Sequence, residues 1–391
     1  MTRSGPPTTF PATPRSLRSR VSQGLSSAAA IGRFELQVCS RCAAVQYPPR
    51  EACVRCLSTR LVWQPQSGAG ELLSRTVLHH SHDPYFRARL PWTVGLVRLD
   101  SGPTVVVHLP QEAPCPPARV WVSARLDRSG AGVLVACERK DGADVTDDRR
   151  LREMTSDPRD ANVLVTDGGS AHSQAVVRAL AAAGAARIWV GLAKPGEAVG
   201  VPAGLRDILQ VTCLRLDVTD ENCLREAAAM VGSELDILIN TADIPAAGAA
   251  SEGGLDVARA EMETHYFGLL NLARYFMPCM SARATRTQRL TPAWVNVLSL
   301  FALSTYPPLQ TFSASMAAAH ALSRCMRAQM RQEGVRLVTV FPGPLANENS
   351  QGLPQPKLAS PVLAQSIVVA LRGSVEEVYP GEVAGEWRVT T

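Results

Sequence analysis

The chain has 391 residues, which is enough for two or three domains of ordinary size and a full hydrophobic core. It carries 40 lysine and arginine residues against 35 aspartate and glutamate residues, and the excess of +5 comes from five arginines before residue 35, so the remainder is formally neutral. A neutral folded part lacks the basic stripe of a nucleic-acid binder, and no apolar run reaches the roughly 18 residues of a membrane-spanning helix. We therefore expect neither nucleic acid nor a membrane as a partner.

Residues 1–34 are rich in proline, serine, threonine and arginine. No apolar segment follows the arginines, which argues against a secretory signal. We predict a disordered basic tail, although an acid-poor leader of this kind also resembles an organelle transit peptide. Six of the ten cysteines are scattered singly, as in a protein of a reducing compartment. The sequence thus favours a cytoplasmic location.

The other four cysteines form two close pairs, Cys39-x2-Cys42 and Cys53-x2-Cys56, with ten residues between the pairs. Two such knuckles across a short hairpin give the tetrahedral four-sulfur coordination that suits zinc. Two disulfides are the alternative interpretation. Because all four positions are cysteines, no coordination place is left for water, and we predict a structural rather than a catalytic zinc ion.

Short β-rich runs separated by turn-forming residues follow the cysteines as far as residue 137, a pattern typical of a small barrel or sandwich. Residues 138–160 differ, because 14 of these 23 residues are charged, and we expect a linker or a solvated surface segment there. From residue 161 onward, apolar strands alternate with helical stretches, which predicts βαβ units and a doubly wound parallel sheet.

The segment "VCSRCAAVQYPPREACVRC" resembles the zinc ribbon of the zinc-ribbon/OB-fold proteins that accompany thiolases, and the similarity continues through "GAGELLS" and "PWTVGLVRLDSG". The resemblance implies a zinc ribbon over 35–60 and an OB-fold barrel over 61–137. Members of that family are usually partners of thiolase-like enzymes or of the aldolases that cleave steroid side chains, and some bind acyl-CoA. An OB fold can also bind single-stranded nucleic acid, and Tyr85, Phe86, Arg87 and Arg89 would be its platform here.

Residues 161–391 resemble the short-chain dehydrogenase/reductase family. The matching segments follow one another in family order: "NVLVTDGGSAHSQAVVRALAAAG", "LRLDVTDENCL", "LDILINTADI", "YFGLLNLARYFMPCM", "VNVLSLFALSTY", "FSASMAAAHALSRCMRAQM" and "VRLVTVFPGPL". The predicted fold class is therefore α/β, with a zinc ribbon and OB-fold barrel fused to a Rossmann-type domain.

The family's phosphate-binding turn, T-G-x-x-x-G-x-G, is altered in this chain. Its three glycines are replaced by Asp167, Ala171 and Ser173, which add side-chain atoms and one negative charge beside the expected diphosphate. The sequence thus argues against NAD(P) as a cofactor. The matching positions that survive are Asp217, Val218 and Asn240, as vestigial cofactor-binding residues, and Lys194 is a candidate contact for a 2′-phosphate.

The family's catalytic set is altered as well. Its tyrosine and lysine correspond to Phe312 and Met316, neither of which can transfer a proton or supply an ammonium group, and its relay asparagine corresponds to His265. Ser299 is the surviving catalytic position. Tyr306, His265 and His320 are alternative proton carriers, with purely structural roles as the other interpretation.

Two functional hypotheses follow. The first is a non-catalytic accessory subunit that partners a thiolase-like or lipid-transfer-protein-like enzyme and helps to bind acyl-CoA or a related thioester, with homo-oligomerisation through the dehydrogenase helices as a further option. The second is an NAD(P)-dependent 3-oxoacyl reductase with atypical catalytic residues. A remaining alternative is two inherited folds joined by a charged linker, without a small-molecule role.

Overall fold

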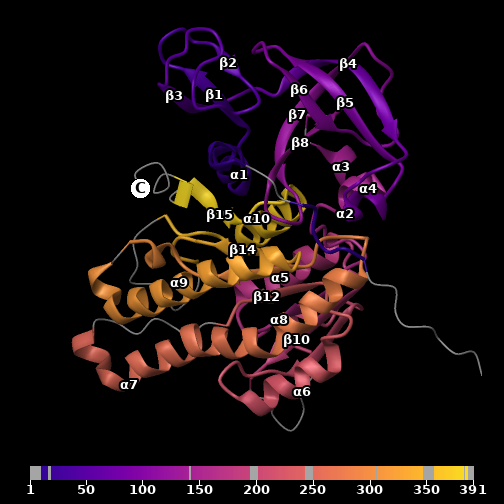
Figure 1. Ribbon diagram of the computed structural model, residues 1–391. Coiled ribbons are helices and arrows are strands. Elements are labelled where there is room, and N and C mark those ends of the chain that lie inside the picture. The colour runs from indigo at the N-terminus through magenta and orange to yellow at the C-terminus, as the bar shows by residue number, and fades with distance from the viewer. Residues whose placement is uncertain are drawn as a thin grey trace, which may run out of the picture. The chain divides into compact units, whose positions relative to one another are not determined.

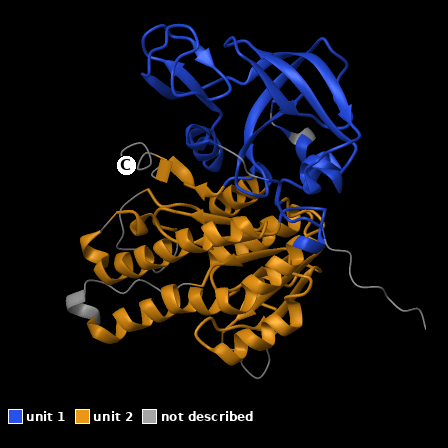
Figure 2. Cartoon of the chain, viewed as in Figure 1, with its two compact units in different colours: residues 1–156, 285–291, 372–375 blue, residues 157–284, 292–371, 376–391 orange. Residues whose placement is uncertain are grey.

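The computed structural model describes residues 10–15, 19–140, 142–193, 201–242, 250–304, 306–346, 356–382 and 384–385. The chain divides into two compact units, which are coloured separately in Figure 2. Unit 1 contains residues 1–156, 285–291 and 372–375, and unit 2 contains residues 157–284, 292–371 and 376–391. Among the described residues, no helix is both long enough and apolar enough to cross a membrane.

Unit 1 contains a small antiparallel sheet (Figure 1). Its strands are β1 (Glu35–Cys39), β2 (Val45–Gln46) and β3 (Leu61–Pro65), in the order β2-β1-β3. The first cysteine pair begins at the last residue of β1 and the second lies between β2 and β3, so the sheet holds both knuckles. This arrangement is the expected zinc ribbon.

The second part of unit 1 is a closed five-stranded barrel in the order β4-β5-β6-β8-β7. The strands are β4 (Ala69–Leu78), β5 (Trp92–Leu99), β6 (Thr104–His108), β7 (Ala118–Leu126) and β8 (Gly132–Cys137). All neighbours are antiparallel except β6 and β8, whose bridge joins His108 to Val135. Alternating buried and exposed residues on β5 and β6 place one face of each strand inside the barrel. The predicted OB-type barrel is confirmed.

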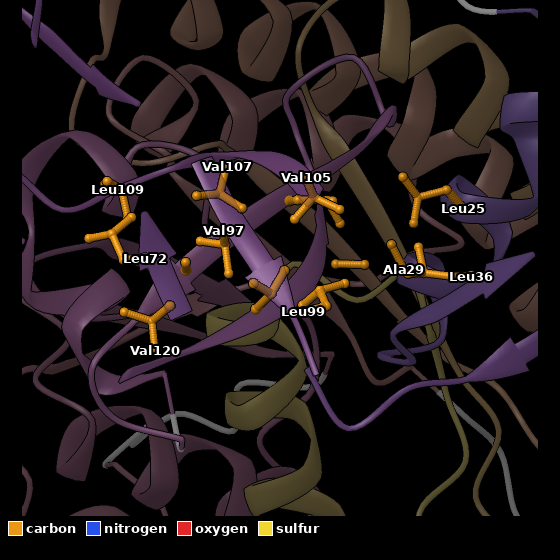
Figure 3. Packing of buried hydrophobic residues seen from close by; sticks show 14 of the residues in the cluster. Leu25, Ala29, Leu36, Leu72, Val97, Leu99, Val105, Val107, Leu109 and Val120 are labelled. Carbon is orange, nitrogen blue, oxygen red and sulfur yellow. The ribbon is translucent and has the colours of Figure 1, made fainter. Parts of the chain in front are cut away.

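A short helix, α1 (Gln23–Ala30), packs into the same core as the barrel strands (Figure 3). Leu25 and Ala29 lie among Val105, Leu36 and the other buried side chains of the cluster. We had expected residues up to 34 to belong to a disordered tail, and for α1 this expectation is wrong. The apolar face of Leu25, Ala28 and Ala29 is buried, and that burial stabilises the helix.

The charged segment after the barrel also differs from the expected linker. It forms α3 (Ala143–Asp147) and α4 (Arg149–Arg152), and Leu151 and Met154 are buried with α2 (Pro84–Arg87) and Trp92 against the outside of the barrel. Glu153 is buried too, and its carboxylate accepts from Arg89 at 2.7 Å and from Arg128 at 3.2 Å. The segment is therefore ordered because its few apolar residues are buried and its buried charges are paired.

Unit 2 is built on a seven-stranded parallel sheet with the order β11-β10-β9-β12-β13-β14-β15. The strands are β9 (Asn162–Val165), β10 (Arg187–Leu192), β11 (Val211–Arg215), β12 (Ile237–Asn240), β13 (Ala293–Val297), β14 (Arg336–Val340) and β15 (Glu377–Val378). In chain order this is 3-2-1-4-5-6-7, the doubly wound order, with its reversal beside β9. β12 and β14 are buried at every residue and β9 at all but its first, as expected for the central strands of a parallel sheet covered on both faces.

The helices of unit 2 connect these strands. They are α5 (Ala171–Ala182), α6 (Glu221–Val231), α7 (Ala250–Met262), a π-helical turn (Glu263–Phe267), α8 (Gly268–Arg286), α9 (Gln310–Gln332) and α10 (Ser360–Gly373), with short 3-10 turns at Ala203–Leu205, Leu300–Ala302 and Pro307–Leu309. A further 3-10 turn, Arg20–Ser22, precedes α1 in unit 1. The carboxyl ends of β9 and β12 meet at the topological switch point, where ligands bind in this architecture.

Candidate functional site

The first candidate site is the cysteine cluster of the ribbon. All four sulfur atoms lie within 4.8 Å of one another, and the Sγ atoms are 3.6 Å apart both for Cys39 and Cys56 and for Cys42 and Cys53. A disulfide would require about 2.05 Å, so none of these cysteines is bridged. Sulfurs at about 2.3 Å from a tetrahedral zinc ion stand roughly 3.8 Å apart, and the four cysteines therefore fit a structural zinc ion.

The two knuckles have the same local structure. In the first, the N–H of Ala43 donates to the carbonyl of Cys39 at 2.8 Å, and in the second, that of Leu57 donates to the carbonyl of Cys53 at 3.0 Å. Ala43 and Leu57 have φ values of 56° and 58°, the left-handed region. The ribbon keeps this strained backbone at both knuckles, which turns each pair of thiols toward a common centre.

The second candidate site is the turn after β9. Thr166, at the end of that strand, donates through Oγ1 to Oδ1 of Asn240 at 3.0 Å and accepts from the N–H of Thr241 at 3.0 Å. These bonds join the ends of β9 and β12 at the switch point. Asn240, the candidate for a vestigial cofactor site, is buried, and its side chain links the ends of these two strands.

Asp167 lies in this turn, and its carboxylate is turned back onto the chain. Oδ1 accepts from the N–H of Gly169 at 2.9 Å, and Oδ2 accepts from the N–H of Ser170 at 3.3 Å. The next residues begin α5, where Ser170 caps the helix by accepting from the N–H of Ser173. Three backbone donors of the turn are therefore bonded to side chains of the same turn.

The backbone N–H groups that would meet the diphosphate of a dinucleotide are already bonded within this turn. In this fold the diphosphate takes backbone N–H groups at the start of the first helix, and here Asp167 and Ser170 hold such groups. On the adenine side, Val218 is buried, and Oδ1 of Asp217 already accepts from the N–H and hydroxyl of Thr219 at 2.9 and 2.7 Å.

The residues at the family's catalytic positions are buried, and the position of the family's tyrosine holds no proton donor. Phe312 is 7% exposed and Met316 3%, both on α9. Ser299, which follows β13, is 9% exposed, and its Oγ accepts from the N–H of Phe301 at 3.2 Å as the cap of a 3-10 turn. The surviving serine thus has a local structural role in this conformation.

His265 is the polar member of this cluster. It lies in the π-helical turn, its Nδ1 is 2.9 Å from the Oγ of Ser315, and its ring meets that of Phe312 edge to face at 5.4 Å. Ser315 in turn donates to the carbonyl of Phe312 at 2.9 Å. Sequence analysis identified His265 but missed Ser315, whose only signal was its position one helical turn after the altered tyrosine.

The two other candidate proton carriers, Tyr306 and His320, each pack against an aromatic ring. Tyr306 stacks on Phe301, with ring centroids 5.1 Å apart, and His320 packs edge to face on Phe341 at 5.0 Å. Burial lowers the pKa of His320, which favours its neutral form. Lys194, the candidate contact for a 2′-phosphate, lies outside the described residues.

Of the residues considered as a nucleic-acid platform, Tyr85 and Arg89 are buried, Phe86 is half-buried and Arg87 is exposed. Tyr85 is 2% exposed, with the guanidinium of Arg89 3.7 Å from its ring centroid, and Arg89 is itself buried in its ion pair with Glu153. Burial raises the pKa of the Tyr85 hydroxyl. Phe86 packs against Trp92. This segment therefore stabilises the outside of the barrel.

Three family models match the chain. A short chain dehydrogenase model matches residues 161–357, a ChsH2 C-terminal OB-fold model matches 63–135, and a ChsH2 rubredoxin-like zinc ribbon model matches 26–62. The ribbon match begins within α1, in agreement with the packing of that helix. The order of the three matches is the order of the three folded parts.

The matching curated proteins are similar to the dehydrogenase half. Dehydrogenase/reductase SDR family member 7B of Rattus norvegicus is 30% identical over 137 residues, which is 34% of this chain and 40% of that protein. The 3-ketodihydrosphingosine reductase of Bacteroides thetaiotaomicron is 26% identical over 153 residues, 38% of this chain and 51% of that protein. The chain thus spans about two fifths to one half of the length of these relatives.

Among solved structures, a short chain dehydrogenase from Burkholderia cenocepacia in complex with NADP is 30% identical to this chain. The match covers 59% of this chain and 92% of that protein, with a TM-score of 0.53. A short-chain dehydrogenase from Streptomyces avermitilis, 22% identical with a TM-score of 0.50 and covering 59% and 92% of the two chains, shares the fold. The chain belongs to the short-chain dehydrogenase family, and in it that domain follows a zinc ribbon and an OB fold of the ChsH2 type.

Proposed function

We propose that this protein is an accessory subunit in which the dehydrogenase domain no longer performs hydride transfer. One observation carries the proposal: the positions of the family's catalytic tyrosine and lysine hold Phe312 and Met316, and both side chains are buried. A phenyl ring cannot give a proton to a carbonyl oxygen, and a thioether cannot lower the pKa of a neighbouring acid. The reduction that relatives perform would lack its acid.

The positive part of the proposal concerns the ribbon and barrel. Their models are those of ChsH2 domains, and proteins with this pair of domains accompany thiolase-like enzymes. We propose that the protein partners such an enzyme and helps to bind an acyl-CoA or related thioester. Four arginines of the ribbon (Arg41, Arg50, Arg55 and Arg60) are exposed, which suits a phosphate-bearing thioester or an acidic partner surface.

The experiment uses the full chain loaded with zinc. We expect no oxidation of NADPH above background with acetoacetyl-CoA, and we expect binding of acetoacetyl-CoA by calorimetry. Co-expression with thiolase-like proteins from the same genome should give a complex that survives a sizing column. Turnover at rates typical of the family would refute the accessory function, and so would the lack of both thioester binding and complex formation.

A second function has an observation in its favour. The NADP-bound structure from Burkholderia cenocepacia matches nearly the whole dehydrogenase half at 30% identity, and His265 with Ser315 places a titratable ring beside the altered tyrosine position. An NAD(P)-dependent 3-oxoacyl reductase that uses His265 as its acid is the alternative. His265→Gln would abolish such turnover and would leave accessory binding unchanged.

A further inference from the structure

In a Rossmann fold, the anionic diphosphate of a dinucleotide binds at the start of the first helix, which is α5 in this domain. Backbone N–H groups converge there, and the helix dipole adds partial positive charge. In this chain the carboxylate of Asp167 takes two of those groups, from Gly169 at 2.9 Å and from Ser170 at 3.3 Å. We propose that Asp167 is a permanent internal substitute for the diphosphate of a dinucleotide and excludes phosphate-bearing ligands from the site.

The neighbouring side chains hold the carboxylate in place. The hydroxyl of Ser173 donates to Oδ2 of Asp167 at 3.4 Å, and the hydroxyl of Ser170 lies 2.7 Å from that of Ser173. Ser173 is fully buried, at the position where the family has the third glycine of the turn. The space that a glycine would leave open is therefore filled by a side chain that bonds to the internal anion.

Contacts with neighbouring strands hold the turn on both sides. The N–H of Gly168 donates to the carbonyl of Gly191 at 2.9 Å, and a Cβ atom on Gly168 would lie 2.3 Å from Cγ1 of Val190. The carbonyl of Asp167 accepts from the hydroxyl of Thr241 at 3.3 Å. Bonds to β10 and to the end of β12 thus fix both sides of the turn, and an incoming phosphate meets a fixed like charge.

More of the family's residues are retained where the adenine would bind than where the diphosphate would bind. Val218 is buried, and a Cβ atom on Gly268 would lie 2.7 Å from its Cγ2, so the wall beneath an adenine ring is close-packed. Asp167 should therefore exclude only ligands that carry phosphate. A ligand without phosphate should not respond to a change at residue 167.

The test compares four forms of the full chain by calorimetry with NADPH, ADP and adenosine: the wild type, Asp167→Gly, Asp167→Asn and Asp220→Gly. Asp220 is a matched control, because its carboxylate also accepts N–H groups at a helix start, those of Asn222 at 3.0 Å and Cys223 at 3.2 Å. We expect at least a tenfold gain in affinity for NADPH and ADP in Asp167→Gly only, and no change for adenosine.

Asp167→Asn retains an acceptor for the N–H of Gly169 but loses the charge, so it should gain less than Asp167→Gly. Equal gains would overturn the assignment, because charge alone would then explain the exclusion. Micromolar binding of NADPH by the wild type would overturn it as well. So would a gain that requires Ala171→Gly and Ser173→Gly and is not seen with Asp167→Gly.

This inference does not rest on the proposed accessory function, and the experiment separates the two. The readout is binding, and none of the variants alters Phe312 or Met316, so no turnover is expected in any form. Thermal melting of each variant checks that it is folded. An unchanged affinity of Asp167→Gly for acetoacetyl-CoA would show that the thioester is bound elsewhere, whatever happens to the nucleotide.

Discussion

The zinc ribbon and the dehydrogenase site differ in how many of their families' functional residues they have retained. The ribbon keeps every ligand of its metal, with two knuckles of the same backbone geometry around four thiols. The dehydrogenase domain keeps its strand order and buried core but has lost the glycines of its phosphate turn and two of its reactive groups.

The difference follows from what each set of residues does for folding. The metal ligands are the core of the ribbon, because the segment 35–65, with its three short strands, buries few apolar side chains. In the dehydrogenase domain the sheet and its helices supply the stability, and the catalytic residues add little. Phe312 and Met316 are buried, and burial of such a side chain contributes about 1.5–3 kcal/mol relative to leaving it exposed.

The largest effect should come from breaking the ribbon. Cys53→Ser removes one ligand, and since a structural zinc site contributes about 10–16 kcal/mol to the folding of a small zinc domain, we expect loss of zinc and unfolding of the ribbon. Zinc analysis and circular dichroism measure this. Cys115→Ser, at an exposed cysteine away from the cluster, is the control. One zinc ion per chain in Cys53→Ser would show that three thiols suffice.

The second prediction concerns the dehydrogenase domain, where two substitutions restore the family's tyrosine and lysine. Phe312→Tyr combined with Met316→Lys should leave NADPH oxidation with acetoacetyl-CoA at background, because the phosphate turn remains occupied by Asp167. Adding Asp167→Gly should raise the rate into the range that a positioned acid provides, about 10²–10⁴-fold. Turnover from the first two changes alone would mean that Asp167 does not obstruct the cofactor.

The third prediction concerns the link between the ribbon and the barrel. A Cβ atom on Gly24 of α1 would lie 2.1 Å from Cε2 of Trp63, on β3 of the ribbon. Gly24→Ala should therefore destabilise unit 1 by about 1–3 kcal/mol, seen as a lower melting temperature and changed tryptophan fluorescence. Ser27→Ala, on the same helix, is the control. Equal melting of the two variants would show that α1 does not pack on the ribbon.

The smallest effect is a pH dependence in the dehydrogenase domain. Burial lowers the pKa of His320 in the folded chain below its unfolded value, near 6.5. Protonation therefore favours the unfolded state, and stability is lost as the pH falls below about 6.5. His320→Gln should flatten this slope by less than about 1 kcal/mol, because the ring is half-buried. Chemical denaturation at pH 7 and 5 measures it, and an unchanged slope would contradict the assignment.

Much of the fold could be predicted from the sequence, since strands such as β5 and β8 have the bounds that their apolar runs indicate. The zinc ligands were predictable because coordination chemistry fixes both residue type and spacing. The error was in segments of low apolar content. Residues 23–30 and 143–154 look disordered or solvated on composition, yet a few side chains such as Leu25 and Leu151 find a core supplied by distant strands.

The sequence by itself determined which groups are present at each site, and hence that four thiols can bind zinc and that Phe312 and Met316 cannot transfer a proton. Only the tertiary structure decided what the remaining polar groups do. It turned Asp167 onto the N–H groups of its own turn and brought His265 to Ser315, 50 residues further along the chain. The physical reason is that a residue type fixes which hydrogen bonds are possible, whereas the fold selects the partners.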